Sequence, residues 1–322
     1  MIDHTTRSAS KAASAGIACL AFSADSARAH SGAASGQVNF NSWSWPPFII
    51  IPLLVSAALY AVGARRMWRR NSHASLSWKP IAFFVCGWLS LVAVLDSPIH
   101  ELSEQLFSVH MIQHEILMLI SAPLLLLGCP SLVFVWALPS RWRRIGPLTS
   151  HWAIQKPWNV ISAPVAAWSL HAIALWSWHA PVLFDATLRS DAMHAAQHIS
   201  FFATALLFWW TLLGEHHSRL GDGAAMLYTF TTAIHMSILG ALLTFAPRAW
   251  YPAYTFTAPL WNLSPLEDQQ LGGLIMWIPA GTILFIASLF LLHRWMKHSD
   301  DRWALGNTAS HIRQIASTHH ES

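Results

Sequence analysis

The sequence is poor in charged residues and in cysteine. Only 11% of its 322 residues are charged, whereas 54% are hydrophobic. About a quarter of the residues of an ordinary soluble domain are charged, so this class is excluded. The three cysteines, Cys19, Cys86 and Cys129, do not form a disulfide framework. A Gly-rich phosphate loop, a nucleophile elbow and a helical HExxH pattern are also missing, and we expect no enzymatic activity.

Long apolar runs take the place of these features. Each run is about as long as the hydrocarbon core of a bilayer requires of a helix. They predict an all-α fold, a polytopic membrane helix bundle with seven transmembrane helices. The expected spans are 47–67, 80–96, 106–127, 160–179, 193–213, 224–245 and 270–292.

Basic residues predict the orientation of these spans. Those that follow the first, third, fifth and seventh spans are Arg65, Arg66, Arg69, Arg70, Lys79, Arg141, Arg143, Arg144, Lys156, Arg219, Arg294, Lys297, Arg302 and Arg313. The opposite loops hold only Arg189 and Arg248. Because cytoplasmic loops are enriched in Lys and Arg, the N-terminus is expected outside and the C-terminus in the cytoplasm. The net charge of +4 is thus explained by topology, and we expect no nucleic-acid partner.

The chain is expected to have four parts. These are a signal peptide (1–29), an extracytoplasmic linker (30–46), a seven-span membrane domain (47–292) and a cytoplasmic tail (293–322). Small residues at Ala27 and Ala29 resemble a signal cleavage site. Cleavage there would expose the amine and ring of His30, a pair able to chelate copper(II).

Two histidine pairs stand inside the expected spans. His110 and His114 are four residues apart, as are His194 and His198, so each pair lies on one face of a helix. His171, His179 and His235 also fall in the half of the bundle expected to face outward. Ionisable groups within spans are rare and mark functional sites by default. Imidazole binds copper, zinc, iron and nickel, so the histidines predict a metal site without selecting the metal.

Neighbouring residues extend this prediction. Glu115 and Asp268 are acidic groups at or near spans, so each is expected to be paired, to be protonated or to support a ligand histidine. Acidic residues in the outer loops would concentrate cations at the mouth of the cluster. They are Asp96, Glu101, Glu104, Asp185, Asp191, Glu267 and Asp268. Met111, Met193 and Met236 adjoin cluster histidines and would favour copper(I), but adjacent helical residues point about 100° apart, so a packing role explains them equally well.

Several motifs together resemble those of CtaG-type cytochrome c oxidase assembly factors. The resemblance covers roughly residues 45–295. Its motifs are His110-x-x-x-His114, Ser121-Ala122-Pro123-Leu124, Gly128-Cys129-Pro130, Trp176-Ser177-Trp178-His179-Ala180-Pro181, His194-x-x-x-His198, Trp209-Trp210, Asp268-Gln269-Gln270-Leu271-Gly272-Gly273 and Met276-Trp277.

The resemblance implies a seven-span protein of the bacterial plasma (inner) membrane that handles copper for haem-copper oxidase. By position it points to a shared polar set of His110, His114, His179, His194, His198 and Asp268. One departure is Gln197, where much of the family is expected to carry an acidic residue. A carboxylate next to a ligand histidine is therefore not expected at this position.

The histidine cluster predicts a metal site and the resemblance implies copper, so together they predict a copper site that faces the periplasm, with copper(I) as the expected state. Its expected ligands are His110, His114, His179, His194 and His198, with His171 and His235 forming a deeper site or a relay. Copper would pass to haem-copper oxidase subunits or be exchanged with a periplasmic copper chaperone. Two alternatives remain open at this point: a metal-free assembly scaffold or proton-coupled transporter, and a bis-histidine haem-binding membrane cytochrome.

Overall fold

The computed structural model describes residue 43 and residues 46–70, 77–140, 152–213 and 220–318, and every regular element in these ranges is a helix. The expected signal peptide, His30 and most of the linker lie outside the described residues. The elements are α2 (Pro47–Arg70), α3 (Trp78–Leu95), α4 (Pro98–Ser103), α5 (Phe107–Glu115), the π-helix η1 (Ile116–Ser121), α6 (Ala122–Leu127), α7 (Pro130–Ala137), α10 (Trp152–Ile161), α11 (Pro164–Trp178), α12 (Pro181–Arg189), α13 (Asp191–Leu213), α14 (Asp222–Thr244), the short 3-10 helices η3 (Pro252–Thr255) and η4 (Ala258–Trp261), and α15 (Pro265–Thr318).

The described helices agree with a multi-pass membrane protein. Six are long and apolar enough to cross a bilayer, and a seventh crossing arises if the bent pair 155–161 and 164–178 is one span. The two members of this pair meet at an angle of 64°. Pro164 starts the second member, and a proline disfavours helical geometry in the residue before it. The expected fourth span is therefore not one straight helix, and the count of seven stays a prediction.

The expected third span contains a change of helix type. The α-helix α5 passes into the π-helix η1 directly after Glu115, and α6 follows. Pro123 cannot donate a backbone hydrogen bond to the preceding turn, which favours a local departure from the α-helical ladder. Neighbouring helices hold this stretch: Trp209 Nε1 on α13 donates to the carbonyl of Met118 at 2.8 Å, and the hydroxyls of Ser90 and Ser121 lie 2.7 Å apart.

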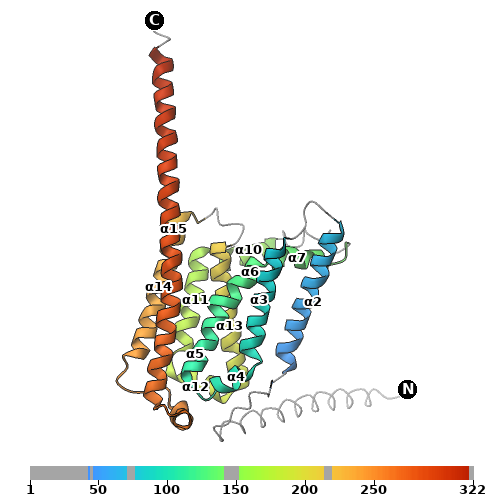
Figure 1. Cartoon of the computed structure of the whole chain (residues 1–322), viewed down its shortest axis with the longest axis vertical. Helices are drawn as coiled ribbons and strands as arrows, with labels where there is room; N and C mark the ends of the chain where they lie inside the picture. The colour runs from blue at the N-terminus through green and yellow to red at the C-terminus, as the bar shows by residue number, and fades with distance from the viewer. Residues whose placement is uncertain (1–42, 44–45, 71–76, 141–151, 214–219, 319–322) are drawn as a thin grey trace, which may run out of the picture.

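Short elements cover the two ends of the bundle. Figure 1 shows α4 and α12 at one end, where α5 begins, and α7 and α10 at the opposite end. The last helix, α15, runs on past this opposite end and stays helical to Thr318, through most of the expected tail (293–322). The two helices that carry the histidine pairs, α5 and α13, begin at the end that carries α4 and α12.

Glycines let α14 and α15 pack closely. A Cβ atom at Gly273 would lie 2.7 Å from both the carbonyl oxygen of Gly240 and the backbone nitrogen of Thr244. Small residues at such contacts allow the close backbone approach that stabilises helix pairs in membranes. Farther along α15, Gly281 is less crowded, since a Cβ there would meet only the Ser237 hydroxyl at 3.1 Å.

We expect Gly273→Ala to destabilise the bundle by about 1–3 kcal/mol, because the new methyl group would meet backbone atoms that cannot rotate away. Gly281→Ala is the matched control on the same helix and should be neutral or slightly stabilising, because alanine is the better helix former. Thermal unfolding of the detergent-purified variants measures the difference. Equal midpoints for the two variants would contradict this account of the α14–α15 contact.

Candidate metal centre

Two helices each present a pair of histidine rings one turn apart. His110 and His114 lie on α5 with ring centroids 4.4 Å apart, and His194 and His198 lie on α13 with the same separation. The pairs face each other: the rings of His110 and His194 stack at 5.2 Å, and those of His114 and His198 are 5.4 Å apart. The structure therefore brings together two motifs more than 80 residues apart in the sequence.

Three of these side chains offer nitrogen atoms close enough to share one metal ion. One ligand atom from each of His110, His114 and His198 lies within 4.8 Å of the others. All three residues are buried, and the ring of Phe201 packs against His114 at 4.7 Å. We call this set the inner group.

The inner group contains buried nitrogen atoms without hydrogen bonds. Neither ring nitrogen of His114 has a partner among the described residues, and Nε2 of His198 also has none. A buried polar atom left unpaired costs about 1–3 kcal/mol, so each such atom needs an explanation. A bound metal ion would accept these lone pairs directly.

Gln197 contacts the inner group. Its Oε1 lies 3.3 Å from Nε2 of His110, and the residue is fully buried. A carboxamide oxygen can only accept, so this contact places the proton of a neutral His110 ring on Nε2 and leaves Nδ1 to act as the ligand atom. An uncharged amide thus occupies the position where a carboxylate was expected from the family resemblance.

His179 lies beside the inner group. Its ring is 6.2 Å from that of His114, and its Nδ1 donates to the Leu175 carbonyl at 2.7 Å. The buried Nε2 has no partner in the described part of the chain. The hydrogen bond therefore leaves the lone pair of a neutral ring on the nitrogen that is free to bind a ligand.

His171 and His235 lie apart from these rings and belong to neither close group of possible ligands among the described residues. His171 Nδ1 is 3.2 Å from the hydroxyl of Thr204, whereas the ring of His235 packs against Trp168 at 5.4 Å. A deeper site or relay formed by this pair stays a prediction.

Asp268 reaches α5 rather than a histidine. Its carboxylate accepts hydrogen bonds from the backbone nitrogens of Phe107 and Ser108, at 2.7 and 3.0 Å, and from the Ser108 hydroxyl at 2.6 Å. The first turn of a helix has unpaired N–H groups, and an acidic cap stabilises it. Asp268 on α15 therefore fixes the start of the helix that carries His110 and His114.

Glu115 is buried, and neither carboxylate oxygen has a hydrogen-bond partner among the described residues. It lies one turn after Met111, whose side chain packs close to Gly272 of α15. Residues four apart share a helix face, so Glu115 and Met111 lie on the same face of the helix. Its expected support of a ligand histidine stays a prediction.

Two residues near the centre were not among the predicted ligands. His100 on α4, Glu104 at the end of α4, and His194 form a second set of possible ligand atoms within 4.8 Å of one another. The stacked rings of His100 and His194 lie 5.2 Å apart. We call this set the outer group, because His100 and Glu104 are only partly buried. Their spacing, His100-x-x-x-Glu104, repeats that of the histidine pairs and could have identified them.

The outer group contains an ionisable carboxyl group, that of Glu104, whereas the inner group contains only imidazoles. Burial, together with the nearby carboxylates of Asp191 and Glu101, raises the pKa of Glu104 to about 7. Burial lowers the pKa of His100, although Asp191 opposes this effect. The ring of His100 is therefore neutral at pH 7, which is the form that binds metals.

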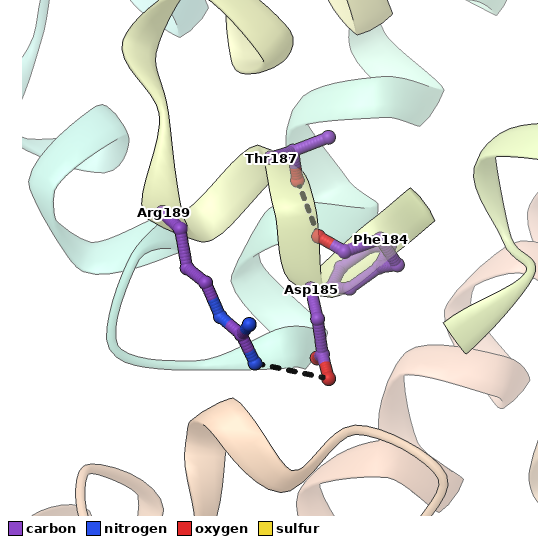
Figure 2. Close-up of polar contacts among 4 residues, drawn as sticks. All are labelled: Phe184, Asp185, Thr187 and Arg189. Carbon is purple, nitrogen blue, oxygen red and sulfur yellow. Dashed lines mark hydrogen bonds and ion pairs between the residues drawn. The ribbon is translucent and has the colours of Figure 1, made fainter. Parts of the chain in front are cut away.

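The short helix α12 closes one side of the centre. Phe184 is fully buried, and its ring lies 5.0 Å from that of His110. Figure 2 shows that the Thr187 hydroxyl donates to the Phe184 carbonyl, at 2.7 Å, and that Asp185 and Arg189 form an ion pair at 4.0 Å. Arg189 is 79% exposed, so this pair adds little to stability. The contribution of α12 is the aromatic wall formed by Phe184.

Comparisons with known proteins match most of the chain. The profile of the family described as cytochrome c oxidase caa3 assembly factor matches residues 58–298, a range that contains both groups. Uncharacterized proteins of Mycobacterium bovis and Mycobacterium tuberculosis are each 25% identical over 265 residues, which is 79% of this chain and 39% of theirs. An uncharacterized protein of Mycobacterium leprae is 25% identical over 80% of this chain and 40% of its own. The chain thus spans about two fifths of these relatives, and no solved structure matches it.

We expect Asp268→Ala to destabilise the protein by about 1–2 kcal/mol, because α5 would lose its cap. Ser108→Ala should cost less, since it removes only the hydroxyl contact and leaves both backbone bonds to Asp268. Thermal unfolding ranks the two variants. Hydrogen exchange at the amides of Phe107 and Ser108 should accelerate in Asp268→Ala alone, and unchanged exchange there would contradict the capping role.

Proposed function

This chain belongs to the cytochrome c oxidase caa3 assembly factor family, and from that premise we propose that it binds copper in the inner group and delivers it to haem-copper oxidase. Delivery is exchange of ligands with an oxidase subunit or a periplasmic copper chaperone and involves no catalytic turnover. The protein works in the bacterial plasma membrane, with the metal centre facing the periplasm.

The observation that carries the proposal is the set of unpartnered nitrogen atoms in the inner group. Three imidazoles from α5 and α13 converge, and His114 has no hydrogen bond in the described part of the chain to compensate for its burial. A packing role for these histidines would leave that cost uncompensated. Imidazole is a good ligand for copper, the metal that the family resemblance implies.

The charge of the inner group favours copper(I). Three neutral imidazoles contribute no negative charge, so a bound ion keeps its full charge in an apolar environment. The solvation cost of burial grows with the square of that charge, which penalises a divalent ion about four times as much as a monovalent one. His179 adds a possible fourth nitrogen, whereas Cys86 and Cys129 are exposed and belong to neither group.

We expect the purified protein to bind copper(I), and we expect His114→Ala/His198→Ala to weaken binding by more than about 100-fold, because two ligands are lost. His293→Ala, at an exposed position on α15, is the matched control and should bind as the wild type does. Competition with a chromogenic copper(I) chelator measures the affinity. Equal affinity in the double variant would refute the site.

The absorbance spectrum of the same samples separates the alternatives. A Soret band in the purified wild-type protein would instead favour a haem-binding cytochrome. Absence of both haem and copper, after reconstitution with copper(I), would favour a metal-free scaffold.

In cells, we expect His114→Ala/His198→Ala to lower haem-copper oxidase activity at normal levels of the assembly factor, because the oxidase would not receive its copper. Added copper should restore part of the activity by supplying the metal through other routes. The measurement is oxidase activity per amount of oxidase protein, with His293→Ala as control. Wild-type activity in the double variant under copper limitation would contradict copper delivery.

A further inference from the structure

The outer group lies between the surface of the protein and the inner group. His100 and Glu104 come from the short α4 segment, whereas His194 comes from the first turns of α13. The His194 ring lies 5.2 Å from that of His100 on one side and 4.4 Å from that of His198 on the other. His194 therefore links the outer group to the inner group.

We propose that the outer group is a second metal site, one that binds a divalent transition-metal ion, copper(II). The ligands are one nitrogen each from His100 and His194 and a carboxylate oxygen from Glu104, whose ligand atoms lie within 4.8 Å of one another. Copper(II) favours such a mixed set of nitrogen and oxygen ligands.

Two observations support the site independently of this spacing. His194 is only 7% exposed, and its buried Nε2 has no hydrogen-bond partner in the described part of the chain. In addition, Asp191 and Glu101 lie close enough to act on Glu104 electrostatically. Their negative potential attracts cations to this end of the bundle.

Charge assigns different ions to the two groups. The carboxylate of Glu104 cancels one charge of a divalent ion, so the occupied outer group carries a net charge of +1. The all-imidazole inner group reaches the same net charge with a monovalent ion. A low-dielectric environment favours the smaller net charge in each case. The two sites are therefore selective for different oxidation states of the same metal.

The assignment of the inner group to copper(I) rests on the proposed function, whereas the outer site stands on its own ligands. The experiment therefore measures the two sites separately. Copper(II) binding is followed by electron paramagnetic resonance at one equivalent of added copper(II), and copper(I) binding by competition with the chelator. The full-length protein is purified in detergent and compared with four variants.

The first variant, His100→Ala/Glu104→Gln, should lose the copper(II) signal with nitrogen coupling, or bind copper(II) at least about 10-fold more weakly, and should keep copper(I) binding. The second, His110→Ala/His114→Ala, should show the reverse. His293→Ala is the matched control, because His293 is exposed on α15 and belongs to neither group, and it should change neither kind of binding.

A copper(II) signal that is unchanged in His100→Ala/Glu104→Gln would overturn the outer site. So would loss of that signal in His30→Ala, since copper(II) would then be held by the amine and ring at the expected mature N-terminus. Failure of the proposed function gives a different result: the wild type would bind no copper(I), while copper(II) binding would still depend on His100 and Glu104.

Discussion

Burial of unpaired imidazole nitrogens is the constraint on which the rest of this structure depends. His114 is packed against Phe201 inside the bundle, and both of its nitrogens lack a hydrogen-bond partner among the described residues. A chain that needed only packing here could use an apolar side chain at no such cost. Contacts from neighbouring helices instead hold this position in place, which is the pattern expected where function opposes stability.

Two of the supporting contacts come from helices that carry none of the inner group's ligands, and a third comes from α13. Asp268 on α15 caps α5 and fixes its start, and Ser90 on α3 holds the π-helical stretch that follows. α13 has two roles, because it carries His194 and His198 and also binds the Met118 carbonyl through Trp209. The motifs around Asp268 and Trp209 in the family resemblance thus have a physical meaning. They set the position of one histidine pair relative to the other.

The sequence predicted the elements of the fold better than their arrangement. Apolar length predicted the long helices, and the four-residue spacing predicted that each histidine pair shares a face, because both signals are local. The facing of α5 and α13 was not predictable, since hydropathy does not encode which helices are neighbours. The bend before Pro164 and the π-helix before Pro123 had a local signal in each proline. The four-residue spacing of His100 and Glu104 was also a local signal. Both residues lie outside the expected spans, however, and hydropathy does not show that α4 folds back on the cluster.

Under the proposed function, His194 connects the inner group to the end of the bundle from which metal would be supplied. An ion that enters from the end of the bundle carrying α4 and α12 meets Glu104 and His100 before it meets fully buried rings, because these two residues are only partly buried. Each following ring lies 4.4–5.4 Å from the one before, along His100, His194, His198 and His114. Spacing this close allows one ligand to be exchanged for the next without releasing an ion into the apolar interior, where an uncoordinated charge would be very costly. The same four-residue spacing on α4, α5 and α13 therefore serves one purpose, which is to keep a coordinating atom within reach at each depth.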